Sequence, residues 1–97
     1  MVDRVFKEGK FLNSPFLTFK FILSLDDSSP RVSFIVPKTV SKLAVKRNSL
    51  RRVGYNVLKK YISTLPQGLV GAFIFKKLID SSSDLENEIK FILDKIR

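Results

Sequence analysis

Arg47, Asn48, Arg51 and Arg52 are the residues whose types and spacing best suit binding chemistry. An arginine guanidinium can bind two phosphate oxygens at once, and an asparagine amide can reach base edges or 2′-hydroxyl groups. On a helix, residues three and four apart are neighbours. One helix side would therefore present Asn48, Arg51, Arg52, Tyr55 and Lys59, with Arg47 at its flank. This pattern predicts a surface for a phosphate-rich ligand.

The charge of the chain is large and unevenly distributed. The 97 residues include 18 Lys and Arg against 9 Asp and Glu, a formal net charge of +9. No acidic residue occurs between Asp27 and Asp80. The cations of that interval are Arg31, Lys38, Lys42, Lys46, Arg47, Arg51, Arg52, Lys59, Lys60, Lys76 and Lys77. A solvated structural helix gains from pairs of opposite charge, so this single-sign interval indicates a polyanionic partner.

Several kinds of protein chemistry are excluded or disfavoured. The chain has no Cys and no His, which removes thiolate chemistry and the commonest general base and metal ligand. Asp26 and Asp27 are adjacent in an expected turn, where their side chains can bond the local backbone. We therefore expect no catalytic side chain and no metal ligand in the protein. No apolar run is long enough for a membrane span and no signal-peptide pattern opens the chain, so we expect a cytoplasmic protein.

The first half of the chain predicts a short helix and two strands. Residues 2–8 favour a helix that ends at Gly9. Residues 15–25 and 31–36 are rich in aromatic and β-branched side chains, and turn residues lie between them. We predict that these two strands form a hairpin.

The second half predicts a long helix, a strand and a final helix. Apolar spacing indicates a helix from about 39 to 61 with a core-facing stripe, and Gly54 near the stripe indicates a close packing contact. That stripe comprises Leu43, Leu50, Val53, Val57 and Tyr61. Residues 69–75 favour a buried strand, and Ser83 to Glu86 have the spacing of a capping box. The last helix should bury Leu85, Ile89, Ile92, Leu93 and Ile96, with Phe91 pointing away. The order α-β-β-α-β-α predicts one α+β domain over residues 1–97, with helices packed mainly on one face of a small sheet.

The stretch after the second strand resembles a known signature. The strand ends in Val36-Pro37-Lys38, and the helix contains Ala44-Val45-Lys46-Arg47-Asn48-Ser49-Leu50-Arg51-Arg52. This resembles the bacterial ribonuclease P protein component, as does the segment from Val5 to Gly9. The sequence departs from the family pattern at Ser49 and Tyr55, where basic residues are usual, and at Val2, where an aromatic residue is expected.

The resemblance implies a fold, partners and site residues. The fold would be ribonuclease P protein-like, with a left-handed βαβ crossover. The partners would be a catalytic RNA and precursor tRNA, with Mg²⁺ bound chiefly by the RNA, which hydrolyses the 5′ leader from the tRNA. No membrane and no obligate protein partner is expected. The residues expected to bind the catalytic RNA are Lys38, Lys42, Lys46, Arg47, Asn48, Arg51, Arg52 and Lys59. The leader would lie in a cleft between sheet and helices, on Phe6 and Phe19, with Phe16 as a further candidate.

Two other functions remain open from the sequence. A general RNA-binding or ribosome-associated protein could share the basic helix without the ribonuclease P partner. A membrane-surface protein could use a basic amphipathic helix, provided that the apolar side of the helix is not buried in the fold.

Overall fold

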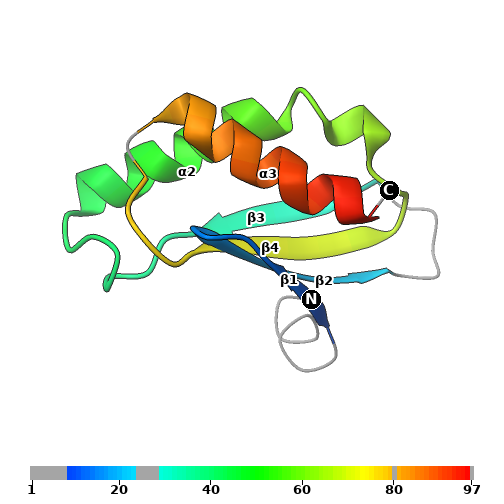
Figure 1. Cartoon of the computed structure of the whole chain (residues 1–97), viewed down its shortest axis with the longest axis horizontal. Coiled ribbons are helices and arrows are strands. Elements are labelled where there is room, and N and C mark those ends of the chain that lie inside the picture. The colour runs from blue at the N-terminus through cyan, green and yellow to red at the C-terminus, as the bar shows by residue number, and fades with distance from the viewer. Residues whose placement is uncertain (1–8, 24–28, 80, 97) are drawn as a thin grey trace.

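The computed structural model describes residues 9–23, 29–79 and 81–96, which form a four-stranded sheet carrying two long helices (Figure 1). The strands are β1 (Lys10–Asn13), β2 (Leu17–Leu23), β3 (Arg31–Ile35) and β4 (Leu69–Phe75). The helices are α2 (Ala44–Leu58) and α3 (Ser82–Ile96), with a short 3-10 helix, η1 (Ile62–Thr64), after α2. The predicted α+β class is confirmed. The helix predicted over residues 2–8, including Phe6, lies outside the described residues.

Strand β4 lies inside the sheet, which has the order β1-β2-β4-β3. Its sequence, Leu-Val-Gly-Ala-Phe-Ile-Phe, has no polar side chain, and all of its residues except Ile74 are buried. A strand that is apolar on both faces is stabilised most where a strand flanks each of its edges. β4 accordingly pairs antiparallel with β2 and parallel with β3. The strand predicted over residues 69–75 is confirmed.

The predicted hairpin of residues 15–25 and 31–36 is wrong. β4 lies between β2 and β3, so these two strands are not neighbours. β2 instead uses its second edge for β1, a strand that was not predicted from the sequence. β1 has four residues, none of them fully buried, as is usual for a short edge strand. The described elements therefore follow the order β-β-β-α-β-α.

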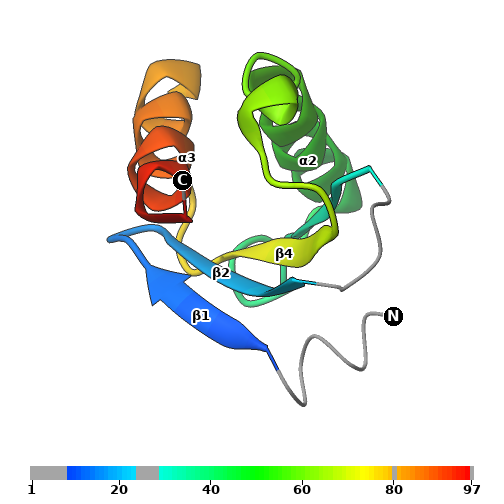
Figure 2. The ribbon, with the colours of Figure 1, turned by 90° about the vertical axis from the view of Figure 1, so that its right-hand side faces the viewer.

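Both helices lie on one face of the sheet, α2 over β3 and β4 and α3 over the β1–β2 side (Figure 2). β3, α2 and β4 form a βαβ unit with parallel neighbouring strands. Figure 1 shows β3 running from right to left beneath α2, and β4 runs parallel to it. In Figure 2, seen from the right-hand side of Figure 1, both strands therefore run away from the viewer, and the chain passes from β3 (cyan, on the right) through α2 above the sheet to β4 on its left. That path is left-handed, opposite to the usual rule. The crossover implied by the family resemblance is confirmed.

A row of aromatic rings forms the centre of the core between sheet and helices. Phe19 of β2 stacks on Phe73 of β4 with centroids 4.3 Å apart, and Phe34 of β3 lies 5.2 Å from Phe73. A Cβ atom on Gly54 would lie 2.7 Å from the Phe34 ring, so α2 approaches the sheet through this glycine. The predicted close contact at Gly54 is confirmed.

Helix α2 is shorter than predicted. The backbone N–H groups of Val40 and Ser41 donate to the carbonyl of Pro37, which makes a turn where the helix was expected to begin. As a result Leu43, predicted in the apolar stripe, precedes the helix and is 70% exposed. Leu50 and Val57 are buried as predicted.

Helix α3 begins differently from the prediction. The Asp84 N–H donates to the Ser81 hydroxyl over 3.3 Å, so Ser81 caps the helix and the predicted capping box from Ser83 to Glu86 is wrong. The Glu86 side chain instead reaches Lys60, which lies just after the end of α2. The apolar face is correct, with Leu85, Ile89, Ile92 and Leu93 all buried, and Phe91 points outward.

Candidate nucleic-acid interface

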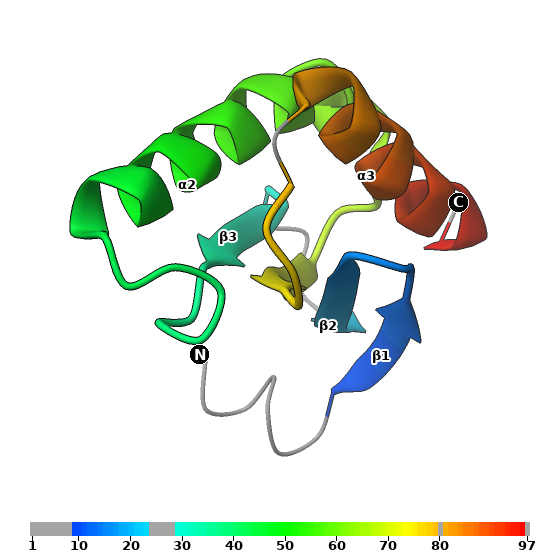
Figure 3. The same ribbon diagram turned by 60° about the vertical axis from the view of Figure 1, so that its left-hand side comes forward.

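The outer side of α2 carries Asn48, Arg51, Arg52, Tyr55 and Lys59, which together are called the α2 cationic face. All five residues are exposed. Figure 3 shows α2 at the outer edge of the molecule, with no described element lying outside it. The helix itself contains no acidic residue. The shared face predicted from the helical spacing is therefore confirmed as a geometric arrangement.

Arg47 fixes the loop that leads into α2. Its Nη1 donates to the carbonyl of Ser41 over 3.0 Å and to that of Lys42 over 2.9 Å. The guanidinium has further N–H donors besides those on Nη1. Lys38 and Lys42 are exposed on this loop, so they lie near the start of α2. Lys46 is only partly exposed and lies on a different side of α2, toward α3.

Two further contacts order the α2 cationic face. The Arg51 Nη2 donates to the Asn48 Oδ1, one turn back on the same helix. The Tyr55 ring meets Phe34 edge to face, with centroids 4.9 Å apart. Tyr55, which stands where the family pattern is usually basic, therefore bridges the helix surface and the end of the aromatic core.

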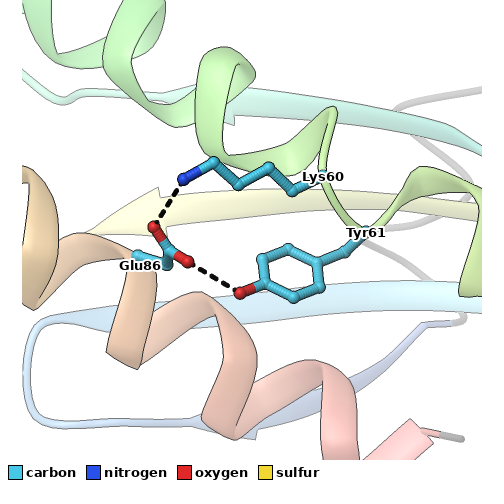
Figure 4. Close-up of polar contacts among 3 residues, drawn as sticks. All are labelled: Lys60, Tyr61 and Glu86. Carbon is cyan, nitrogen blue, oxygen red and sulfur yellow. Dashed lines mark hydrogen bonds and ion pairs between the residues drawn. The ribbon is translucent and has the colours of Figure 1, made fainter.

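No described carboxylate forms an ion pair with Arg47, Arg51 or Arg52. An ion pair that the structure does show, between Lys60 and Glu86 at 3.0 Å, joins the turn after α2 to α3 instead (Figure 4). The arginines are thus not neutralised within the described part of the fold. This is the arrangement expected of a site for an external polyanion.

Glu86 joins the end of α2 to α3 (Figure 4). Its carboxylate accepts a hydrogen bond from Lys60 Nζ over 3.0 Å and another from the Tyr61 hydroxyl over 2.8 Å. These hydrogen bonds, first that of Lys60 and then that of Tyr61, lower the pKa of Glu86 below its ordinary value of 4.5. The sequence pattern assigned Glu86 to helix capping and did not indicate this tie.

The three aromatic residues that were predicted to bind the leader have different outcomes in the structure. Phe19 is 0% exposed in the core, so it cannot stack on a nucleotide, and that prediction is wrong. Between the sheet and helices α2 and α3, Phe19 belongs to the cluster of buried apolar side chains that forms the core. Phe16 is half-buried; its backbone N–H donates to Glu88 over 2.7 Å, and Lys77 Nζ lies 6.0 Å from its ring. Phe6 lies outside the described part of the chain.

The opposite face of the sheet carries no described helix and is called the helix-free face. Side chains alternate along a strand, and Phe19, Phe34 and Phe73 face the helices, so their immediate neighbours face the other way. The side chains that reach this face from β1, β2 and β3 are Phe11, Asn13, Thr18, Lys20, Ile22, Arg31, Ser33 and Ile35. Phe11 is 63% exposed and stands opposite Lys20 in the register of β1 and β2. Sequence reasoning missed this aromatic because it missed β1; the turn residues Asn13 to Pro15 were the available signal.

Within residues 9–23, 29–79 and 81–96, no group of three or more Asp or Glu residues gathers in a way that could hold a metal ion. In the same ranges no helix is long and apolar enough to cross a membrane. The apolar side of α2 packs into the core through Leu50 and Val57, so it is not available to a lipid surface.

Comparison with known proteins agrees with the fold and the motif. The ribonuclease P protein component of Pseudanabaena sp. (strain PCC 6903) is 30% identical over 66 residues, which are 68% of this chain and 57% of that protein. The chain thus matches less than two thirds of the length of this relative.

Solved structures of similar fold include RNase P proteins from two bacteria. The Thermotoga maritima RNase P protein, in complex with 1-(4-fluorophenyl)-2-thiourea, has a TM-score of 0.87 at 20% identity, over 99% of this chain and 94% of that one. The Staphylococcus aureus RNase P protein has a TM-score of 0.85 at 17% identity, over 97% of this chain and 86% of that one. The family model for ribonuclease P matches residues 2–97. With its signature motif on α2 and its left-handed crossover, the chain belongs to the ribonuclease P protein family.

Proposed function

We propose that this protein is the protein subunit of a ribonuclease P, which assists a catalytic RNA in removing the 5′ leader from precursor tRNA in the cytoplasm. The observation that carries the proposal is the exposed α2 cationic face, which no described carboxylate neutralises, on a member of this family. Arginines in a row along a helix can follow a phosphate backbone, and neutralised phosphates release counterions that favour binding. The face would dock on the catalytic RNA.

In this proposal the protein binds and the RNA catalyses. The chain has no His or Cys, and its described residues gather no metal-binding carboxylates. Mg²⁺ would be held chiefly by the RNA, and no step requires a metal ion bound to protein side chains. The protein would help the RNA to retain its substrate and its metal by reducing the repulsion among phosphates.

The leader of the precursor would lie on the helix-free face. An unpaired strand is bound by aromatic rings that stack on bases and by cations that follow its backbone. Phe11 supplies an exposed ring there, beside Lys20, and Arg31 lies on the same face. Phe16, directly before β2, stays a candidate, and Phe6 stays a prediction.

Reconstitution tests the proposal. The protein is added to the ribonuclease P RNA of the same source at a low Mg²⁺ concentration at which the RNA alone cleaves slowly. We expect cleavage at the mature 5′ end of the tRNA to be restored. A folded protein that leaves the cleavage rate unchanged over a range of Mg²⁺ concentrations would contradict the proposal.

A second candidate is a general RNA-binding or ribosome-associated protein. It is favoured by the burial of Phe19, which removes one of the leader contacts that the family resemblance implies. Competition separates the two functions. A precursor with its leader should displace labelled substrate from the RNA–protein complex better than mature tRNA does, whereas a general binder would not distinguish them.

A further inference from the structure

A groove lies between α2 and α3. It consists of two hollows of about 160 Å³ and about 290 Å³, which share Val53 and Ser82 as lining residues. The smaller hollow extends toward Ser49 and Ser81, and the larger one toward Asn56. This feature is called the interhelical groove. Each hollow is at or below the lower end of the usual range of roughly 300–1,000 Å³ for ligand pockets, so a ligand must be small.

The lining of the larger hollow combines an apolar floor with polar groups at its rim. Val53 and Val57 supply apolar surface, and the Asn56 amide offers both a donor and an acceptor. Lys60 and Glu86 lie at the same hollow, but their charges are paired with each other over 3.0 Å. A planar, uncharged group with hydrogen-bonding edges suits such a lining better than an ion does.

The groove adjoins the α2 cationic face. Residues three and four apart on a helix have Cβ atoms roughly 5–6 Å apart. Arg52 is therefore a neighbour of both Ser49 and Asn56, and Lys59 is a neighbour of Asn56. Two exposed cations thus stand along the outer rim of the groove, on the side where an RNA backbone would lie.

We propose that the interhelical groove binds the base and ribose of a single nucleotide of the RNA whose backbone lies on the α2 cationic face. Arg52 and Lys59 hold the phosphates that flank this nucleotide, Val53 and Val57 contact its base, and the Asn56 amide hydrogen-bonds the edge of the base. The inference rests on the proposed function, because it requires that α2 docks on RNA. It adds base recognition to a surface that otherwise meets only phosphates.

Two variants with exposed asparagines test the groove. Asn56→Ala removes the amide at the groove, and Asn87→Ala removes an exposed amide on α3 that does not line it. Affinity for the ribonuclease P RNA is measured as a function of salt concentration. We expect Asn56→Ala to weaken binding by roughly three- to tenfold, as for the loss of a hydrogen bond. Its salt slope should equal that of the wild-type protein, because every phosphate stays neutralised, and Asn87→Ala should bind normally.

The inference and the proposed function fail in different ways. Unchanged affinity of Asn56→Ala, in a preparation in which Arg52→Ala weakens binding and flattens the salt slope, would overturn the groove assignment alone. An altered salt slope for Asn56→Ala would also overturn it, because the residue would then act on the binding of the RNA backbone. Failure of the wild-type protein to bind the RNA would overturn the proposed function.

A titration of the isolated protein tests independently whether the interhelical groove binds a base. Amide chemical shifts are followed by nuclear magnetic resonance while uridine 5′-monophosphate, adenosine 5′-monophosphate or inorganic phosphate is added. We expect both nucleotides to shift the resonances of Val53, Asn56 and Ser82, and inorganic phosphate to leave them in place. Identical shifts with nucleotide and phosphate would mean that the groove does not receive the base, and so would shifts confined to the opposite side of α2.

Discussion

The cationic side chains on α2 differ in the hydrogen bonds that they already make within the protein. Arg51 is oriented by Asn48, and Arg47 uses Nη1 to hold the preceding loop. Arg52 and Lys59 are exposed beside the groove. The contact between Asn48 and Arg51 lies within the motif itself. The asparagine of the motif is thus a positioning group for its arginine as well as a candidate ligand for RNA.

Substitution of Phe11 tests whether the leader binds on the helix-free face. We expect Phe11→Ala to weaken binding of precursor tRNA to the RNA–protein complex by roughly 1–3 kcal/mol, the usual contribution of one stacked base. Binding of mature tRNA, which has no leader, should not change. Equilibrium binding of the two tRNAs measures both effects, and the stability of the protein should stay constant because Phe11 is 63% exposed.

Phe91→Ala is the matched control for Phe11. Phe91 is also an exposed ring, 42% accessible, but it belongs to α3 on the other face of the sheet. Equal losses of affinity for the two variants, or a loss with mature tRNA as large as with the precursor, would remove Phe11 from the leader site.

Site residues were predicted best where helical spacing decided their placement. Asn48, Arg51, Arg52 and Lys59 share a face because the geometry of an α-helix requires it. Phe19 was assigned to the leader site from the family resemblance, and the residue pattern did not indicate that Phe19 lies on the face of its strand that the helices cover. With nine Phe in the chain, aromatic type alone could not separate the core from the surface.

At the scale of elements, the close packing of α2 on the sheet depends on a glycine, Gly54, which has no side chain. Gly54→Ala adds a methyl group where a Cβ atom would lie 2.7 Å from the Phe34 ring. Alanine improves helix propensity by roughly 1 kcal/mol, but overpacking costs roughly 1–3 kcal/mol, so we expect a net loss of stability. Urea unfolding measures the change. Val45→Ala, at a helix position that is 82% exposed, is the control and should stay within about 0.5 kcal/mol of the wild-type protein. A Gly54→Ala protein more stable than wild type would show that α2 does not pack this closely.

The tie between α2 and α3 predicts a dependence of stability on pH. The pKa of Glu86 is lower in the folded protein than its ordinary value of 4.5, so the ionised carboxylate stabilises the fold above that pH. The contribution is lost as the pH falls through the lowered folded-state pKa. We expect Glu86→Gln to have a lower melting temperature than wild type at neutral pH, with the difference shrinking in acid. A difference that does not change with pH would show that the charge of Glu86 is not responsible.

Elements were predictable from local pattern, but their pairing was not. The strand over residues 69–75 and the buried face of α3 follow from runs and spacing of apolar side chains. The neighbours of β4 depend on competition among strands for its two edges, which no local segment encodes. The start of α3 depends on which of several adjacent serines caps it, a choice between hydrogen bonds of similar strength.

At the scale of the whole molecule, the fold places the α2 cationic face and the acidic residues of α3 on different helices. The left-handed crossover places α2 over the β3–β4 side of the sheet (Figure 2). The apolar side of α2 packs into the core, and the residues of the α2 cationic face are exposed. α3 covers the other half of the sheet and carries described acids of the C-terminal region, such as Asp84, Glu86, Glu88 and Asp94. Part of the positive charge of the chain is therefore concentrated on the α2 cationic face, and this side of the molecule can bind RNA.

The salt dependence of binding tests this account most directly. The affinity of the wild-type protein and of the Arg51→Ala/Arg52→Ala variant for the ribonuclease P RNA is measured over a range of salt concentrations. We expect the variant to bind more weakly, with a slope of log affinity against log salt that is shallower by roughly 0.7–0.9 for each phosphate that it no longer neutralises. Its melting temperature should match that of wild type, because both arginines are exposed. A variant that binds with the wild-type affinity and slope would show that the α2 cationic face does not dock on RNA.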